Sequence, residues 1–156
     1  MPKCSLVITN PVARALASIQ PLLSGNEDQR QFVLLHGTAF VPADLPHGVR
    51  KRKIGTCFER AANLALDDEK LGLDLRYAEG FAFGPGSQFP VRHAWLSLDG
   101  RAIDPTWWPH SPRSTYFGVE FPTVTVARAM VERGYYGLLD PIDDLVRSGL
   151  KERTAA

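Results

Sequence analysis

Residues 91–105 read VRHAWLSLDGRAIDP, and this stretch decides the predicted fold. The run from 91 to 98 has the composition and alternation of a β-strand. Asp99-Gly100 follows it, and an Asp-Gly pair after such a run predicts a tight hairpin. A second strand over residues 101–104 then returns beside the first. It ends at Pro105, because proline cannot continue a central hydrogen-bonded ladder.

The hairpin is expected to bring an acid next to a base. Strand alternation places His93 on the same face as Trp95 and Ser97. A two-residue turn pairs positions whose numbers sum to about 199, so His93 lies opposite about residue 106. Asp104 is then two positions away on the same face, within side-chain reach of the imidazole. We therefore expect the carboxylate to orient the ring of His93.

Cys57 lies at the start of a predicted helix, residues 56–68. The threonine before it and Glu59 match the sequence pattern of a capping box. A helix N-terminus carries partial positive charge and free N–H groups, which favour a thiolate and can stabilise a developing oxyanion. Histidine is the usual base for a cysteine nucleophile. The sequence thus predicts a triad of Cys57 as nucleophile, His93 as base and Asp104 as orienting residue.

The remaining elements predict one α+β domain over residues 1–156, with an antiparallel sheet packed against helices. Helices are expected from Asn10-Pro11 to Leu22 or Leu23, and over residues 56–68, 123–133 and 141–150. Strands are expected over 32–36, 73–83, 91–98, 101–104 and, as a short edge strand, 116–121. Residues 26–31 and 41–55 are expected to be loops, and 151–156 a frayed tail.

Charge and cysteine content narrow the classes of function. The chain has 18 basic and 17 acidic residues, a net charge of +1, so it has no overall attraction toward nucleic acid or membranes. No signal-peptide pattern is found, and no apolar run approaches the ~18 residues that span a bilayer. Two cysteines without a CxxC pair predict a cytoplasmic protein rather than a disulfide framework. A single Cys4–Cys57 bridge stays open at this stage.

Five short motifs resemble the papain-like clan of cysteine enzymes. They are Gly55-Thr56-Cys57-Phe58, Asn63-Leu64-Ala65, Tyr77-Ala78-Glu79-Gly80, His93-Ala94-Trp95-Leu96 and Ile103-Asp104-Pro105-Thr106-Trp107. The nearest similarity is to transglutaminase-like and arylamine N-acetyltransferase-like proteins, and to small bacterial and phage proteins with the same Cys, His-Ala-Trp and Asp-Pro-Thr order. The resemblance covers about residues 55–108. It implies a papain-like core and a Cys-His-Asp triad in this chain order. The glutamine that papain-type peptidases use as an oxyanion donor has no identified counterpart, so backbone N–H groups would take that part.

Three further residues are candidates for substrate binding. Glu79 is acidic on an otherwise aromatic strand face, where it could bind a substrate cation or simply face solvent at a sheet edge. Trp95 flanks the predicted base, and Trp107 could form a substrate wall or cap the core. The basic run 50–53 could bind phosphate, but four residues are too few to indicate nucleic-acid binding.

The leading hypothesis is therefore a cysteine-dependent enzyme that forms a thioester with its substrate, a small molecule or a protein. Water as acceptor makes it a hydrolase, such as a peptidase or amidase, and an amine makes it an acyltransferase; we favour the hydrolase. No cofactor is implied, and no HxxxH, HxH or CxxC spacing indicates a zinc site. The alternatives are a non-catalytic ligand- or protein-binding module on the same fold, and a nucleic-acid binder. Oligomeric state is not addressed by any of these patterns.

Overall fold

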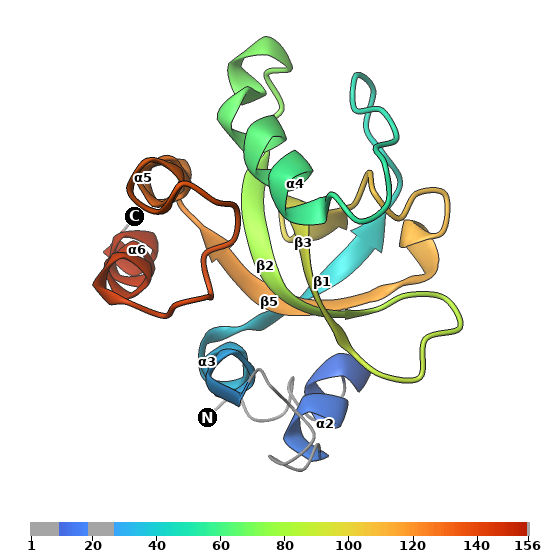
Figure 1. The fold of residues 1–156 in the computed structure, drawn as a ribbon. Helices are drawn as coiled ribbons and strands as arrows, with labels where there is room; N and C mark the ends of the chain where they lie inside the picture. Colours follow the sequence, from blue (N-terminus) through green and yellow to red (C-terminus); the bar gives the residue numbers. More distant parts are fainter. Residues whose placement is uncertain (1–9, 19–26, 156) are drawn as a thin grey trace.

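The computed structural model describes residues 10–18 and 27–155, and its strands close into a small barrel (Figure 1). The strands are β1 (Thr38–Ala43), β2 (Arg76–Phe83), β3 (Val91–Leu98), β4 (Arg101–Ile103) and β5 (Thr115–Phe121). Their order around the barrel is β1-β4-β3-β2-β5, and β1 pairs with β5 to close it. β1 and β4 run parallel, while the other neighbours run antiparallel. The sheet is therefore closed and mixed, not wholly antiparallel as expected.

Helices surround this barrel, which confirms the mixed α+β class. They are α2 (Pro11–Ser18), α3 (Glu27–His36), α4 (Cys57–Leu66), α5 (Thr123–Arg133) and α6 (Asp144–Ala155), with short 3-10 helices at Asp68–Lys70 and Ser111–Arg113. Figure 1 shows α4 above the barrel, α5 and α6 on its left, and α2 and α3 below it. No helix in the described part of the chain combines the length and apolar character that crossing a bilayer requires.

The β3–β4 hairpin has the register that the Asp-Gly turn predicts. Leu96 pairs with Ile103 and Leu98 with Arg101, so the paired numbers sum to 199. Both turn residues have positive φ, 51° at Asp99 and 75° at Gly100. A two-residue turn with both central φ values positive matches the right-handed twist of the strands that it joins. The hairpin therefore carries the chain from β3 to Asp104 in the expected direction.

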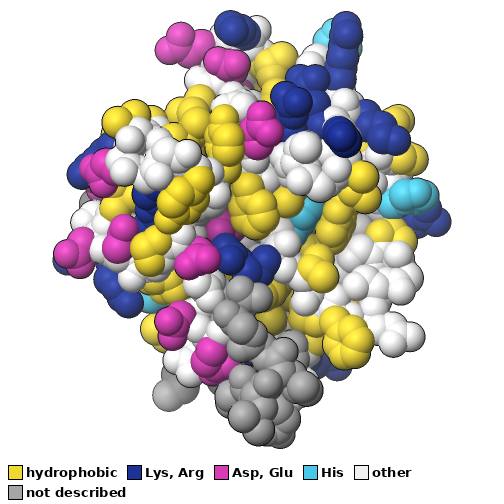
Figure 2. Space-filling model, in the orientation of Figure 1, with side chains coloured by type: hydrophobic (Ala, Val, Ile, Leu, Met, Phe, Trp, Pro, Cys, Tyr) yellow, Lys and Arg dark blue, Asp and Glu magenta, His cyan; other side chains and the backbone are white. Residues whose placement is uncertain are grey.

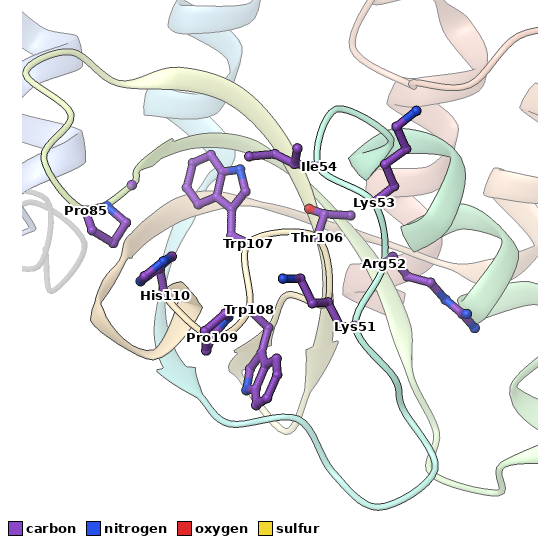
Figure 3. Close-up of a pocket in the computed structure, with 11 residues that line it drawn as sticks. Lys51, Arg52, Lys53, Ile54, Pro85, Thr106, Trp107, Trp108, Pro109 and His110 are labelled. Atoms are coloured by element: carbon purple, nitrogen blue, oxygen red, sulfur yellow. The ribbon is translucent and has the colours of Figure 1, made fainter.

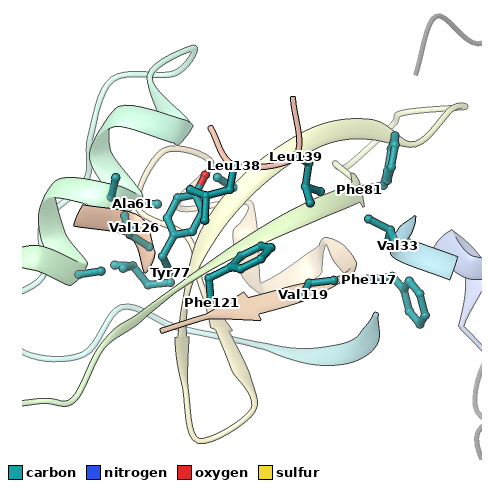
Figure 4. Packing of buried hydrophobic residues seen from close by; sticks show 14 of the residues in the cluster. Val33, Ala61, Tyr77, Phe81, Phe117, Val119, Phe121, Val126, Leu138 and Leu139 are labelled. Atoms are coloured by element: carbon teal, nitrogen blue, oxygen red, sulfur yellow. The ribbon is translucent and has the colours of Figure 1, made fainter. Parts of the chain in front are cut away.

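The barrel has an inner core and an outer core. The inner core takes side chains from all five strands: Phe40, Ala78, Ala82, Trp95, Ala102 and Tyr116. The larger outer core lies between the strands and the helices, and Figure 4 shows part of it around Tyr77, Phe121 and Val126. Since side chains alternate along a strand, His93 points to the same side as Trp95, into the barrel. Gly118 leaves room there, because a Cβ on it would lie 2.7 Å from the Trp95 ring.

Residues 32–36 are helical, so the predicted strand is wrong. They form the second half of α3, which also includes residues 27–31 of the predicted loop. A short apolar run is compatible with a buried helix as well as a buried strand. Glu27 and Asp28 in the first turn favour the helix, because acidic side chains stabilise the positive end of its dipole. The predicted first helix is confirmed over α2, where Asn10 accepts hydrogen bonds from the N–H groups of Val12 and Ala13; its continuation past residue 18 lies outside the described residues.

Closure of the barrel makes one loop prediction wrong in part, and it makes the edge position of one correctly predicted strand wrong. The predicted loop over 41–55 begins inside β1, which pairs with both β4 and β5. The predicted edge strand, β5, has a partner on each side, β1 and β2. Both strands are therefore in the interior of the sheet, and their partners are distant in the chain. At the C-terminal end, α6 begins only at Asp144 and continues through the predicted frayed tail to Ala155.

Glu79 is fully buried, which corrects its interpretation as a substrate-binding or solvent-facing residue. One carboxylate oxygen accepts hydrogen bonds from the Tyr77 hydroxyl and the Leu138 N–H, both at 2.7 Å. The other accepts from Arg92 at 3.0 Å and the Leu139 N–H at 3.2 Å. A buried carboxylate is tolerated when hydrogen bonds and a cation replace its hydration. Glu79 thus joins β2 to the segment between α5 and α6.

The Glu79→Gln variant should destabilise the fold by about 3 kcal/mol, because a neutral amide breaks the buried pair with Arg92 and presents an N–H group toward other donors. Urea unfolding measures the free energy of unfolding. Glu132→Gln makes the same charge change at a site 57% exposed and should stay within about 0.5 kcal/mol of the parent protein. Equal effects of the two substitutions would contradict the structural role given to Glu79.

Candidate active site

Asp104 lies at the end of the β3–β4 hairpin, and its carboxylate accepts five hydrogen bonds. It is fully buried directly after β4. Its Oδ2 accepts from His93 Nε2 at 2.7 Å and from the Tyr116 hydroxyl at 2.8 Å. Its Oδ1 accepts from the Thr106 hydroxyl at 2.9 Å, the Thr106 N–H at 3.1 Å and the Trp107 N–H at 3.2 Å. Five donors from three parts of the chain fix the direction of this carboxylate.

His93 is held between this carboxylate and an aromatic ring. Its side chain is only 3% exposed, and the imidazole stacks on the Trp107 indole with centroids 3.8 Å apart and planes 17° apart. Nε2 faces Asp104, and an ionised carboxylate can only accept, so Nε2 carries a proton. Nδ1 is therefore the nitrogen left for a second partner. The prediction that Asp104 reaches His93 across the hairpin is confirmed by this contact.

Cys57 lies close to His93. Its free thiol is half-buried at the first residue of α4, and its proximity raises the pKa of the imidazole. A backbone hydrogen bond, Arg52 N–H to the Pro105 carbonyl at 2.9 Å, ties the segment before α4 to the segment after β4. This bond brings the start of the helix to the end of the barrel where Asp104 lies. Cys4 lies outside the described residues.

The first turn of α4 is not capped in the predicted way. The Thr56 side chain makes no cap hydrogen bond, and its hydroxyl instead donates to the Lys53 carbonyl at 2.6 Å. The first N–H groups of a helix have no partner within the helix. Since Thr56 does not occupy them, the N–H groups beside the Cys57 thiol remain able to bind a negatively charged oxygen.

His93 and Asp104 each shift the pKa of the other. For His93, burial is the largest influence and acts to lower the pKa, but Asp104 and Cys57 outweigh it and raise the pKa from 6.5 to about 9. For Asp104, burial acts to raise the pKa, but hydrogen bonds led by that of His93 hold it below 3.8. Burial and the charge of Asp104 also raise the pKa of Tyr116, so its hydroxyl stays protonated and donates. At neutral pH the site therefore holds an imidazolium against a carboxylate.

These shifts link folding stability to pH. Because folding raises the pKa of His93, protonation of the imidazole contributes to the free energy of unfolding. This contribution is complete below pH 6.5 and is lost as the pH rises through about 9. A lowered aspartate pKa stabilises the fold above pH 3.8, and this contribution is lost as the pH falls through the lowered value. The two contributions overlap at mildly acidic pH.

The structure brings together some of the predicted site residues and separates others. Cys57, His93 and Asp104 meet at one end of the barrel, and Trp107 covers the imidazole. Trp95 is 0% exposed in the inner core, so its interpretation as a substrate-binding residue is corrected: it supports the barrel beneath His93. Glu79 is buried against the loop after α5, as described above.

Tyr116 is the one partner of Asp104 that the sequence analysis did not single out. It reaches Asp104 because β5 closes the barrel against β1 and β2. Its position in a run of alternating strand residues gave no indication of this contact, because the pairing of β5 is set by segments far away in the chain. Thr106 lies within the quoted Asp-Pro-Thr motif, and its two hydrogen bonds to Asp104 explain why a hydroxyl suits that position.

A pocket of about 640 Å³ is lined by Trp107 and Thr106, which contact His93 and Asp104, although none of Cys57, His93 and Asp104 lines it (Figure 3). One wall is the segment from Lys51 to Ile54, just before Cys57, and the other includes Pro85 and the chain from Thr106 to His110. Trp107 belongs both to this wall and to the stack on His93. Figure 2 shows Lys and Arg side chains gathered over the loop between β1 and α4, next to a band of hydrophobic side chains.

Comparisons with protein-family models, with curated proteins and with solved structures find no significant match. Among the described residues, no three His, Cys, Asp or Glu side chains are grouped so that they could hold a metal ion.

The His93 imidazole should titrate at about pH 9, and Asp104→Asn should lower that pKa, because the amide removes the strongest influence that raises it. NMR of the ¹⁵N-labelled imidazole measures both values. Cys57→Ala should also lower the pKa, by a smaller amount, since its influence ranks below that of the Asp104 hydrogen bond. A His93 that titrates near 6.5 in the parent protein, or that is unaffected by Asp104→Asn, would contradict this account of the site.

Proposed function

We propose that this protein is a cysteine-dependent acyl-transfer enzyme with Cys57 as nucleophile, His93 as proton donor and acceptor, and Asp104 as orienting residue. One observation carries the proposal: an imidazole fixed at Nε2 by a buried carboxylate lies close to a free, half-buried thiol at a helix N-terminus. Covalent acyl transfer by a thiol needs a nucleophile next to a base, and a third group that orients the base. The papain-like core stays part of this proposal.

The first half of the reaction uses the imidazolium. In this step the Cys57 thiolate, next to the His93 imidazolium, attacks the carbonyl carbon of the substrate. The carbonyl oxygen becomes negatively charged and is stabilised by the unoccupied N–H groups of the first turn of α4. As the bond to the leaving group breaks, the His93 imidazolium gives that group its proton. The products of this half are a thioester on Cys57 and a neutral imidazole.

The second half regenerates the enzyme. A water molecule attacks the thioester carbon while neutral His93 takes its proton, and the carbon–sulfur bond then breaks. The acid leaves, and the thiolate and the imidazolium are restored. An amine in place of water gives the transferase version of the same step, with an amide as product. We favour the hydrolase, because Cys57 is only half-buried and a thioester on it is therefore accessible to water.

Iodoacetamide at pH 6–7 should label Cys57 stoichiometrically, because the thiolate form reacts and His93 favours that form. Mass spectrometry measures the labelling in the Cys4→Ser variant, in which the second thiol is absent. His93→Ala should slow the labelling by roughly a hundredfold, as expected when a positioned acid–base group is lost. An unreactive Cys57 in the folded protein, or labelling that is indifferent to His93, would reject the proposal.

The acyl intermediate itself can be trapped with p-nitrophenyl acetate. A burst of nitrophenol equal to the amount of enzyme, with one acetyl group on Cys57, is expected in the parent protein and not in Cys57→Ser. Asp104→Asn should keep the fold, as monitored by circular dichroism, and slow the burst. A steady release of nitrophenol that is the same in Cys57→Ser would show that the thiol takes no part.

A further inference from the structure

The pocket beside the triad has an apolar wall of unusual composition. Trp107 and Trp108 both line it, with their indoles extending in opposite directions, and so do Pro85 and Pro109 (Figure 3). Ile54 faces them from the opposite segment and is 71% exposed. The exposed Ile54 side chain and the half-buried indoles provide apolar surface on which a flat, apolar ligand group can pack. A volume of about 640 Å³ is within the range of small-molecule sites.

The charged side chains that line this pocket carry one sign. Of the described residues that line the pocket, Lys51, Arg52 and Lys53 are cationic and none is acidic. The ion pairs among the described residues do not include either lysine. Two carboxylates bond to lining residues without lining the pocket themselves: Asp44 accepts from the Trp108 indole N–H at 2.6 Å, and Asp104 from the Trp107 N–H at 3.2 Å. The pocket therefore attracts anions and repels cations.

The positions of these cations single out Lys51. In Figure 3 the Lys51 side chain extends toward the two tryptophans, whereas Arg52 extends away from them toward α4. Lys53 lies at the rim next to Ile54. An ammonium group beside two indole rings is placed to bind the charged end of a ligand whose flat part lies against the tryptophans.

We infer that this pocket binds the non-reacting part of the substrate, and that this part is an aromatic group that carries a carboxylate or another anionic group. The role as a substrate subsite rests on the proposed function, since Trp107 joins the pocket to the imidazole of His93. The binding itself depends only on the tryptophan wall and on Lys51. A small aromatic acid amide or thioester therefore fits the site better than a cationic peptide.

Binding is tested with 2-naphthoate and its neutral amide, 2-naphthamide, on the Cys57→Ser variant, in which no chemistry occurs. In ¹⁵N spectra, the indole N–H signals of Trp107 and Trp108 should shift on addition of 2-naphthoate, and that of buried Trp95 should not. The acid should bind about fivefold more tightly than the amide, the size expected for one exposed ion pair. Lys51→Met should abolish this preference, and Lys51→Arg should restore it.

Lys70→Met is the matched control, because it removes the same charge from an 80% exposed side chain in another part of the molecule, and it should leave the preference intact. Equal binding of acid and amide, or shifts confined to other residues, would overturn the inference. So would a preference for the acid that survives Lys51→Met.

The substrate role has its own measurement in the protein with Cys57 intact. There 2-naphthoate should slow the labelling of Cys57 by iodoacetamide, and 2-naphthamide should do so less effectively. Binding without any protection would overturn the subsite and leave a separate ligand site. Charge-dependent binding combined with an unreactive Cys57 supports the pocket and rejects the enzyme, whereas a reactive Cys57 with no 2-naphthoate binding rejects the pocket alone.

Discussion

A buried imidazole–carboxylate contact, His93 with Asp104, is the constraint on which the rest of the site depends. Removing both groups from water is costly, and the cost is offset only when their geometry is good and other donors complete their hydrogen bonds. Here Tyr116 and Thr106 supply those donors, and the indole of Trp107 covers the ring. The barrel provides the dry interior in which such a pair is strongly coupled. Its consequence is a histidine that stays protonated at neutral pH, next to a thiol.

The barrel and the helix contribute different parts of the proposed chemistry. The β3–β4 hairpin holds base and acid in one register, so their distance is set by strand pairing. The helix contributes the thiol and the N–H groups of its first turn, which Thr56 leaves unoccupied. Besides the packing of α4 on β2 and β3, a backbone hydrogen bond between Arg52 and Pro105 connects the two parts. The same connection forms the pocket, because it brings Lys51–Ile54 opposite the tryptophans that follow Asp104.

Glu79 and Asp104 are similar buried carboxylates, but one stabilises the fold and the other belongs to the candidate active site. Glu79 and Asp104 are both fully buried carboxylates that accept several hydrogen bonds. Glu79 is paired with an arginine and two backbone N–H groups, and it fixes a loop. Asp104 is paired with a histidine that lies close to a thiol. Both carboxylates are buried, so the difference in their roles comes from the residue with which each is paired.

The sequence by itself determined the local part of this protein. Asp99-Gly100 sets the turn, the turn sets the register, and the register brings Asp104 to His93, because a hairpin relates neighbouring residues by short-range geometry alone. Only the tertiary structure decided the closure of the barrel, which turned the predicted loop at Val41 into a strand and the predicted edge strand into an interior one. It also decided that Trp95 and Glu79 are buried and that Tyr116 reaches Asp104. These outcomes depend on pairing and packing between segments far apart in the chain, where an apolar or alternating pattern is compatible with several partners.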